Sequence, residues 1–170
     1  MSQQLKKIFN PGTDEVAQTF IIESWHVSQS VDAFTGVEAY DISLSGSFNL
    51  TGSMTHGSNT LASGLNSYAQ GLDSQANGGV SHAEGRGTQA NGDGSHTEGY
   101  VTIASGNFSH AEGANTQATG YASHAEGSNT QAIGDYSHAE GEYVTASGPF
   151  SHAEGDYTIS AGDYSHAEGV

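Results

Sequence analysis

The sequence predicts an all-β solenoid, a narrow coil of parallel strands that completes one turn every fourteen residues. The first observation is a pentapeptide, Ser-His-Ala-Glu-Gly, that returns at this spacing through the second half of the chain. The second is a glycine at every seventh position from Gly57 to Gly169. The third is that alanine stands two residues, and serine or threonine four residues, before most of these glycines. Fixed periods of this kind are typical of solenoids, in which each repeat stacks on its neighbours.

The composition excludes several classes of protein. The 170 residues include 3 basic and 19 acidic ones, so a nucleic-acid partner is not expected on electrostatic grounds. The absence of cysteine excludes disulfides and thiolate metal sites. With 34% hydrophobic residues and 24 glycines, the chain has too few bulky side chains for a conventional core.

Residues 1–52 are predicted to be a separate attachment region. The apolar run Thr19–Ile22 has strand character, and Ser24 is placed to cap a short helix that ends near Gly36. We interpret Trp25 as a packing anchor of this region rather than a ligand platform. The N-terminal lysines are not followed by an apolar stretch, and no run approaches the roughly 20 apolar residues that span a bilayer. Neither a secretory signal nor membrane insertion is therefore expected.

Residues 53–170 are predicted to form about nine turns of the coil. Residues i, i+2 and i+4 of a strand share one face, so Ser or Thr, Ala and Gly of each half-repeat should point inward. The two residues after each glycine should be corners, giving two five-residue strands and two corners per turn. A helical solenoid is excluded by a glycine every seven residues, and collagen because glycine does not stand at every third position.

His and Glu of the pentapeptide should then point outward and form two columns. Their members are His82, Glu84, His96, Glu98, His110, Glu112, His124, Glu126, His138, Glu140, His152, Glu154, His166 and Glu168. Stacked carboxylates repel one another, so we expect the adjacent histidines to supply counter-charge, with each imidazole pushed toward its protonated form.

Three interpretations of these columns stay open. The favoured one is a structural His–Glu ladder, either exposed to solvent or sandwiched between identical chains. The second is a metal or anion column, because His-x-Glu projects two ligands from one strand face. The third is a pH switch at a subunit interface. Catalysis is not expected, because a motif repeated in register indicates architecture rather than one active site; we therefore predict no enzyme activity and no cofactor.

Two further columns carry packing signals. The companion half-repeat places glutamine at its first outward position in several turns, which is typical of stacked parallel strands. These residues are Gln75, Gln89, Gln117 and Gln131. The corner before the pentapeptide becomes aromatic toward the C-terminus, where packing against a neighbouring chain is favoured over a sugar-binding platform. These residues are Phe108, Tyr136, Phe150 and Tyr164. An ice-binding solenoid is disfavoured because most repeat threonines fall in the inward set: Thr88, Thr102, Thr116 and Thr130.

The half-repeat pattern Ser-x-Ala-x-Gly-x-x-Ser/Thr-x-Ala-x-Gly resembles the head repeats of trimeric autotransporter adhesins. The resemblance covers Ser53–Val170 and implies a left-handed parallel β-roll with fourteen residues per turn, assembled as a homotrimer. Those heads usually carry two aliphatic residues where this chain has His124 and Glu126. Because these positions face the trimer axis in the heads, the resemblance implies that the His–Glu columns lie between subunits.

The Ser-His-Ala-Glu-Gly variant itself resembles repeats of bacteriophage and prophage tail-fibre proteins. The region Trp25–Gly52 resembles the N-terminal parts of phage fibre proteins. This resemblance implies a rigid trimeric shaft or head of a phage tail or phage-like contractile injection particle, used for host-surface attachment. Residues 1–52 would bind tail, baseplate or other particle proteins, and a host cell-surface receptor is a further expected partner. The protein would be assembled in the host cytoplasm and be extracellular, on the virion or particle, after release.

The alternative function is the head of a bacterial trimeric surface adhesin. A depolymerase is not expected, because the sequence offers no irregular acidic cleft. The sequence stops one residue after a repeat glycine, and terminal repeats normally need a cap, so we expect the natural polypeptide to continue past Val170.

Overall fold

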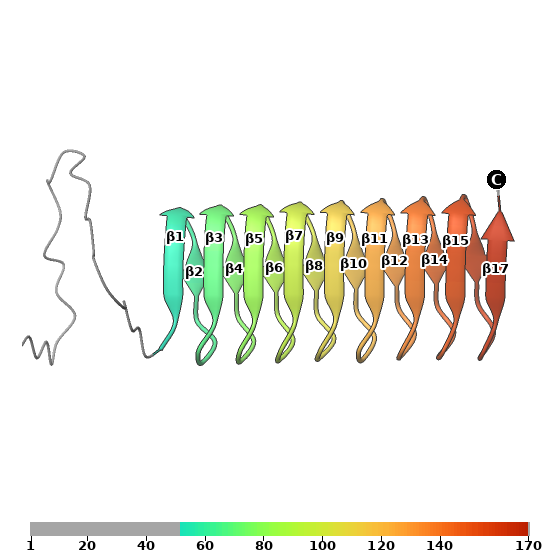
Figure 1. Cartoon of the computed structure of the whole chain (residues 1–170), viewed down its shortest axis with the longest axis horizontal. Coiled ribbons are helices and arrows are strands. Elements are labelled where there is room, and N and C mark those ends of the chain that lie inside the picture. Colours follow the sequence, from blue (N-terminus) through green and yellow to red (C-terminus); the bar gives the residue numbers. More distant parts are fainter. Residues whose placement is uncertain (1–51, 170) are drawn as a thin grey trace, which may run out of the picture. The chain divides into compact units, whose positions relative to one another are not determined.

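A computed structural model describes residues 52–169 and confirms the all-β parallel solenoid (Figure 1). The chain forms two sheets of parallel strands, one with nine strands and one with eight. Successive strands along the sequence belong to the two sheets in turn. The predicted N-terminal strand and helix, and the attachment boundary at residue 52, involve residues outside the described range. Within residues 52–169 there is no helix, and hence none that could cross a membrane.

The long strands form the nine-stranded sheet. They are β1 (Met54–Ser58), β3 (Tyr68–Leu72), β5 (His82–Arg86), β7 (His96–Tyr100), β9 (His110–Ala114), β11 (His124–Ser128), β13 (His138–Glu142), β15 (His152–Asp156) and β17 (His166–Gly169). The short strands form the eight-stranded sheet. They are β2 (Leu61–Ala62), β4 (Gln75–Ala76), β6 (Gln89–Ala90), β8 (Ile103–Ala104), β10 (Gln117–Ala118), β12 (Gln131–Ala132), β14 (Thr145–Ala146) and β16 (Ile159–Ser160).

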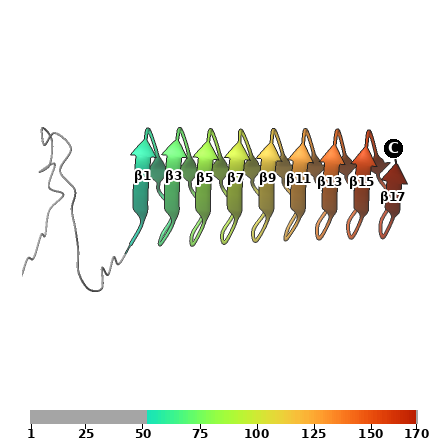
Figure 2. The same ribbon diagram turned by 45° about the horizontal axis from the view of Figure 1, so that its top comes forward.

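The strands pair in one unbroken register. Each residue of a long strand pairs with the residue fourteen positions further on, as His124 does with His138 and Gly127 with Gly141. Figure 2 shows the resulting layers, with the long strands side by side and the short strands behind them. Eight complete turns are therefore stacked, and β17 begins a ninth.

The prediction of two five-residue strands per turn is wrong for the companion half. There the regular strand has only two residues, because the chain turns immediately after its alanine. The amides of Asn91 and Gly92 both donate to the carbonyl of Ala104, at 2.8 and 3.2 Å. The amide of Ser95 then donates back to the carbonyl of Gly92 at 3.2 Å and closes a tight turn.

The interior is filled by small side chains, as predicted. The alanines at the centre of the half-repeats, from Ala69 to Ala153, are fully buried, and so are the inward serines and threonines. The largest fully buried side chain is Val144. Such a thin interior removes little apolar surface from water. The backbone hydrogen bonds between turns therefore contribute much of what holds the turns together.

The glycine column is required by the close stacking of turns. A Cβ atom added at Gly120 would lie inside the van der Waals radius of the carbonyl oxygen of Gly134, in the next turn. The same clash recurs at the repeat glycines of both half-repeats from Gly57 to Gly155. Glycine therefore sets how closely consecutive turns can approach, in addition to allowing the chain to bend.

A left-handed backbone conformation recurs two residues after each repeat glycine. Every seventh residue there is left-handed, with φ between 49° and 58° for the residues other than glycine. They are Asn59, Asn66, Asp73, Val80, Val101, Phe108, Asn115, Ala122, Asn129, Tyr136, Tyr143, Phe150, Tyr157 and Tyr164. Gly87 and Gly94 complete the series. Asn, Asp and Gly tolerate this conformation, whereas valine and the aromatic residues adopt it at a cost.

Candidate functional site: the His–Glu face

The outer surface of the long strands carries the predicted histidine and glutamate columns. Each long strand from β5 to β17 begins with the histidine, and the glutamate follows two residues later on the same face. The imidazole rings stack along the column with centroids 4.7–4.9 Å apart and planes within 19° of parallel. We call this surface the His–Glu face. All the histidines and glutamates named from the sequence lie on it.

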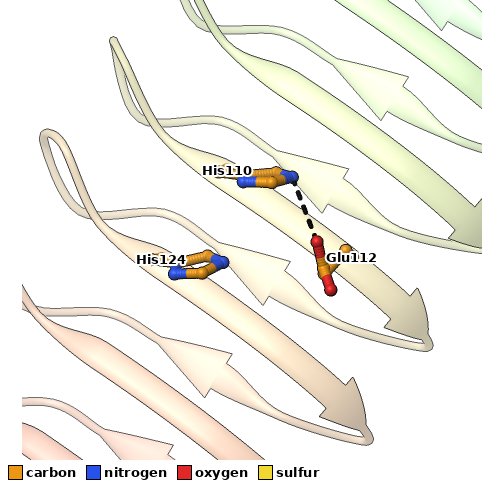
Figure 3. Close-up of side chains that lie close together, drawn as sticks. All are labelled: His110, Glu112 and His124. Atoms are coloured by element: carbon orange, nitrogen blue, oxygen red, sulfur yellow. Dashed lines mark ion pairs between the residues drawn. The ribbon is translucent and has the colours of Figure 1, made fainter.

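Within each strand the histidine and glutamate approach one another without forming a hydrogen bond. The distances from Nε2 to Oε2 are 3.4–3.9 Å, longer than the 2.7–3.2 Å of an ordinary N–H···O bond. Figure 3 shows this arrangement for His110 and Glu112, with the ring of His124 beside them. The histidine and glutamate columns therefore lie side by side, as predicted, but no hydrogen bond joins a histidine to the glutamate of its own strand in these turns.

The inner nitrogen of each imidazole is left without a partner. The side chains are about a third exposed, yet Nε2 is buried and accepts or donates no hydrogen bond in the histidines from His82 to His152. A buried polar atom of this kind costs free energy unless something binds it. In an isolated chain these Nε2 atoms therefore lack a hydrogen-bond partner.

The expectation that the columns push the imidazole toward its protonated form is wrong for His82, His110 and His138. The pKa values of His82, His110 and His138 are lowered from the usual 6.5, chiefly because burial disfavours the charged ring. The neighbouring histidines lower them further, and the glutamates offset only part of this effect. At these three positions burial, together with the stacked histidines, therefore outweighs the glutamate column.

The second turn, at β3, closes the column differently. Tyr68 and Gln70 occupy the places of histidine and glutamate, and the Tyr68 hydroxyl donates to Gln70 Oε1 at 2.6 Å. Gln70 Nε2 donates in turn to Glu84 Oε2 at 2.8 Å, and the Tyr68 ring lies 5.0 Å from the ring of His82. The N-terminal end of the face is therefore hydrogen-bonded, unlike the turns that follow it.

Toward the C-terminus the face contains four groups that could each hold a metal ion. Each has two histidines of adjacent long strands and the glutamate of the first strand, with all three ligand atoms within 4.8 Å of one another. The groups are His110–Glu112–His124, His124–Glu126–His138, His138–Glu140–His152 and His152–Glu154–His166. Among the residues that the structure describes, no such group includes His82 or Glu84.

The glutamines of the short strands form the predicted column, but no hydrogen bond joins their side chains to one another in the described residues. Gln75 pairs in register with Gln89, and Gln117 with Gln131. Beside these glutamines, the side-chain hydrogen bonds between turns instead involve asparagine, as in the 2.8 Å bond from Asn77 Nδ2 to Asn91 Oδ1.

The aromatic corner forms a ring stack of its own. Tyr136, Phe150 and Tyr164 stack with centroids 4.9 Å apart and planes within 8° of parallel. Both faces of the Phe150 ring are covered by its neighbours, so a sugar ring cannot lie flat on it. The sequence predicts an aromatic corner that packs against a neighbouring chain; the structure describes its stacking within one chain.

Comparison with known families agrees with this geometry. Residues 62–79, 125–151 and 139–165 match the model of the YadA head domain repeat. The chain is an adhesin-head-like repeat protein. The second and third matched ranges are offset by one turn of the coil, so the family repeat has the same period as the turn. No curated protein matches the chain.

Proposed function

We propose that the adhesin-head-like repeat assembles as a homotrimer and serves as a rigid, non-enzymatic shaft or head for attachment to a cell surface. The observation that carries the proposal is the His–Glu face, a continuous surface of buried but unpartnered nitrogen atoms on a coil with almost no interior of its own. The resemblance to adhesin heads supports contact between subunits through this face.

The thinness of the coil favours association. In residues 52–169 the buried residues are Gly, Ala, Ser, Thr and Val144, so burial of apolar side chains contributes little to stability. Chains that run in register along one axis form closed cyclic assemblies, in which each His–Glu face can meet its copies. Association would then supply partners for the imidazole nitrogens and remove the face from water.

The first experiment is the mass of the full chain in solution, measured by sedimentation equilibrium and native mass spectrometry. The expected result is three times the 17.5 kDa mass of one chain. A mass equal to one chain at all accessible concentrations would contradict the trimer.

A matched pair of substitutions locates the interface. His138→Glu adds a carboxylate to the His–Glu face, where it would face other carboxylates across the axis, and is expected to dissociate the trimer. Gln131→Glu makes the same change of charge on the opposite, short-strand sheet, where Gln131 is exposed, and is expected to leave the trimer intact. Dissociation by Gln131→Glu alone would assign the interface to the other sheet.

The proposal also concerns the particle or cell surface to which this fibre belongs. The Ser-His-Ala-Glu-Gly variant supports a tail fibre of a phage or phage-like injection particle, with a bacterial surface adhesin as the alternative. Electron microscopy of gold-labelled antibody against the repeat separates the two. Label on the tails of purified particles would support the tail fibre, and label confined to the cell envelope would support the adhesin.

A further inference from the structure

We propose that the C-terminal half of the His–Glu face binds first-row divalent transition-metal ions, two per chain. Each ion would be held by two histidines of adjacent long strands and the glutamate of the first strand, within the four groups described above. Each group lies within one chain, so the inference does not require the proposed trimer; in that trimer the ions would lie between the subunits and be the partners of the imidazole nitrogens.

The separations within the groups suit a shared ion better than a hydrogen bond. The Nε2–Oε2 distances in β9, β11, β13 and β15 are 3.6, 3.7, 3.8 and 3.5 Å. Two donors bound to one Zn²⁺ at about 2.0–2.1 Å with tetrahedral angles lie about 3.4 Å apart. The third donor lies within 4.8 Å. Because the two imidazole rings are stacked with nearly parallel planes, one ring must rotate out of the stack to direct its nitrogen lone pair at the ion.

An independent observation points to a ligand at the same place. Nε2 of His110, His124, His138 and His152 is buried and has no hydrogen-bond partner, although the backbone around it is fully paired. Imidazole nitrogen together with one carboxylate is a donor set that suits Zn²⁺, Ni²⁺ and Co²⁺. Three protein ligands would leave one position of a tetrahedral ion for water.

The arrangement of the groups limits their occupancy. Consecutive groups share a histidine, as the first two share His124 and the last two share His152. If each histidine binds one ion through one nitrogen, neighbouring groups cannot both be filled. Alternate groups can be filled, and their ions would lie two turns apart, roughly 10 Å, which reduces their repulsion.

The test is a titration of the full chain with Co²⁺ after removal of metals by a chelator. Bound ion is counted by equilibrium dialysis, and visible absorption reports coordination by nitrogen and oxygen. Wild-type protein is expected to bind two ions per chain. Phenylalanine is the chosen replacement for histidine because it keeps an aromatic ring in the stack and removes the donor.

The sharing of histidines gives each variant a different expected stoichiometry. His124→Phe leaves two groups that share His152, so one ion per chain is expected. His138→Phe leaves the first and last groups, which share no residue, so two ions are expected and this variant is the matched control. The double variant His124→Phe/His152→Phe removes a ligand from every group and is expected to bind none.

Saturable binding that is unchanged in the double variant, or no saturable binding by the wild-type chain, would overturn the proposal. Circular dichroism of each variant checks that the sheets are retained. If the double variant does not fold, glutamine at Glu112, Glu126, Glu140 and Glu154 provides a second test, because the chain itself carries Gln70 in this column. Loss of these carboxylates should weaken binding about tenfold or more, and unchanged affinity would contradict the assigned ligands.

Discussion

At the scale of single residues, the hydroxyl groups inside the coil fall into two classes. Ser109 Oγ donates to the carbonyl of Gly106 at 2.6 Å, and the same bond recurs in several turns. Thr116 Oγ1, in the companion half-repeat, is buried without a hydrogen-bond partner. Val144 occupies the equivalent position of a later turn, so the coil accepts an apolar residue of the same shape there. The two classes should respond oppositely to removal of the hydroxyl.

Thr116→Val is therefore expected to raise the free energy of unfolding by about 1 kcal/mol, because a buried hydroxyl without a partner is replaced by a methyl group. Ser109→Ala, which removes a hydroxyl that does form a bond, should lower it by about 1 kcal/mol. Urea denaturation followed by circular dichroism measures both. A lower urea midpoint for Thr116→Val would show that this hydroxyl has a partner in solution.

The left-handed corners give a second prediction at this scale. Val101 has a φ of 55° although it is β-branched, whereas Asn115 and Asn129 have a φ of 56° in the equivalent corners of the next two turns. Val101→Asn should raise the free energy of unfolding by about 1 kcal/mol through relief of backbone strain. The reverse change, Asn115→Val, should lower the urea midpoint. Equal midpoints in the two variants would mean that the corner residue does not determine stability.

At the scale of the structural element, the turn of the coil is defined by contacts along the stack rather than by an apolar core. Backbone ladders join each turn to the next, and the glycine column lets consecutive turns reach hydrogen-bonding distance. Histidine stacks on histidine and glutamate lies beside glutamate for the same reason, because identical residues are in register. Any change to one turn therefore acts mainly on its two neighbours.

Gly120→Ala tests this contact. Gly120 does not have a positive φ, so the added methyl group acts only through its clash with the carbonyl oxygen of Gly134. The expected loss is about 3 kcal/mol or more, the upper range for overpacking. Gly162→Ala is the matched control, because its added Cβ would be 3.6 Å from Ser165, an ordinary contact. Similar melting temperatures for the two variants would contradict the role of the glycine column.

The histidine column makes stability depend on pH. Folding lowers the pKa values of His82, His110 and His138 below 6.5, so the unfolded chain binds protons first as the pH falls. The free energy of unfolding should therefore decrease below about pH 6.5, until the folded histidines also titrate. Urea midpoints between pH 7.5 and 5, measured with a chelator present, provide the check. A rise in stability on acidification would instead support the protonated ladder that the sequence suggested.

At the scale of the whole molecule, the described region is a one-dimensional stack in which each turn contacts only the turns beside it. Its length is therefore adjustable in whole turns. Asn115-Thr116 and Asn129-Thr130 are the same dipeptide at the same place in consecutive turns, so the chain offers a natural junction for removing one turn.

Deletion of Thr116–Asn129 removes one full turn and joins Asn115 to Thr130. The shortened protein should keep its β-sheet circular dichroism, with a slightly lower melting temperature. Deletion of Thr116–Ala122 removes half a turn and places two long-strand segments in succession, so that the sheets can no longer continue in register. Equal melting temperatures for the two deletions would contradict the fourteen-residue turn.

The fold could be predicted from the sequence because glycine recurs every seven residues from Gly57 to Gly169 and the pentapeptide every fourteen. An interior of small residues also fits only a very narrow coil. The placement of His124 and Glu126 on the outer face followed from the alternation of strand side chains. The shortness of strands such as β10 could not be predicted, because it depends on where backbone amides find carbonyls in the next turn.

The sequence by itself determined the period, the register, the inward set and the membership of the histidine and glutamate columns, because each is a matter of counting along a strand. Only the tertiary structure decided the chemistry of the His–Glu face. Stacking brings each imidazole within 5 Å of another and buries its Nε2 atom, and the pKa values of His110 and His138 are lowered. The alternation along one strand predicts only that each histidine lies beside its glutamate. The physical reason is that solvation and charge depend on neighbours in adjacent turns, which are fourteen residues away in the chain but in direct contact in space.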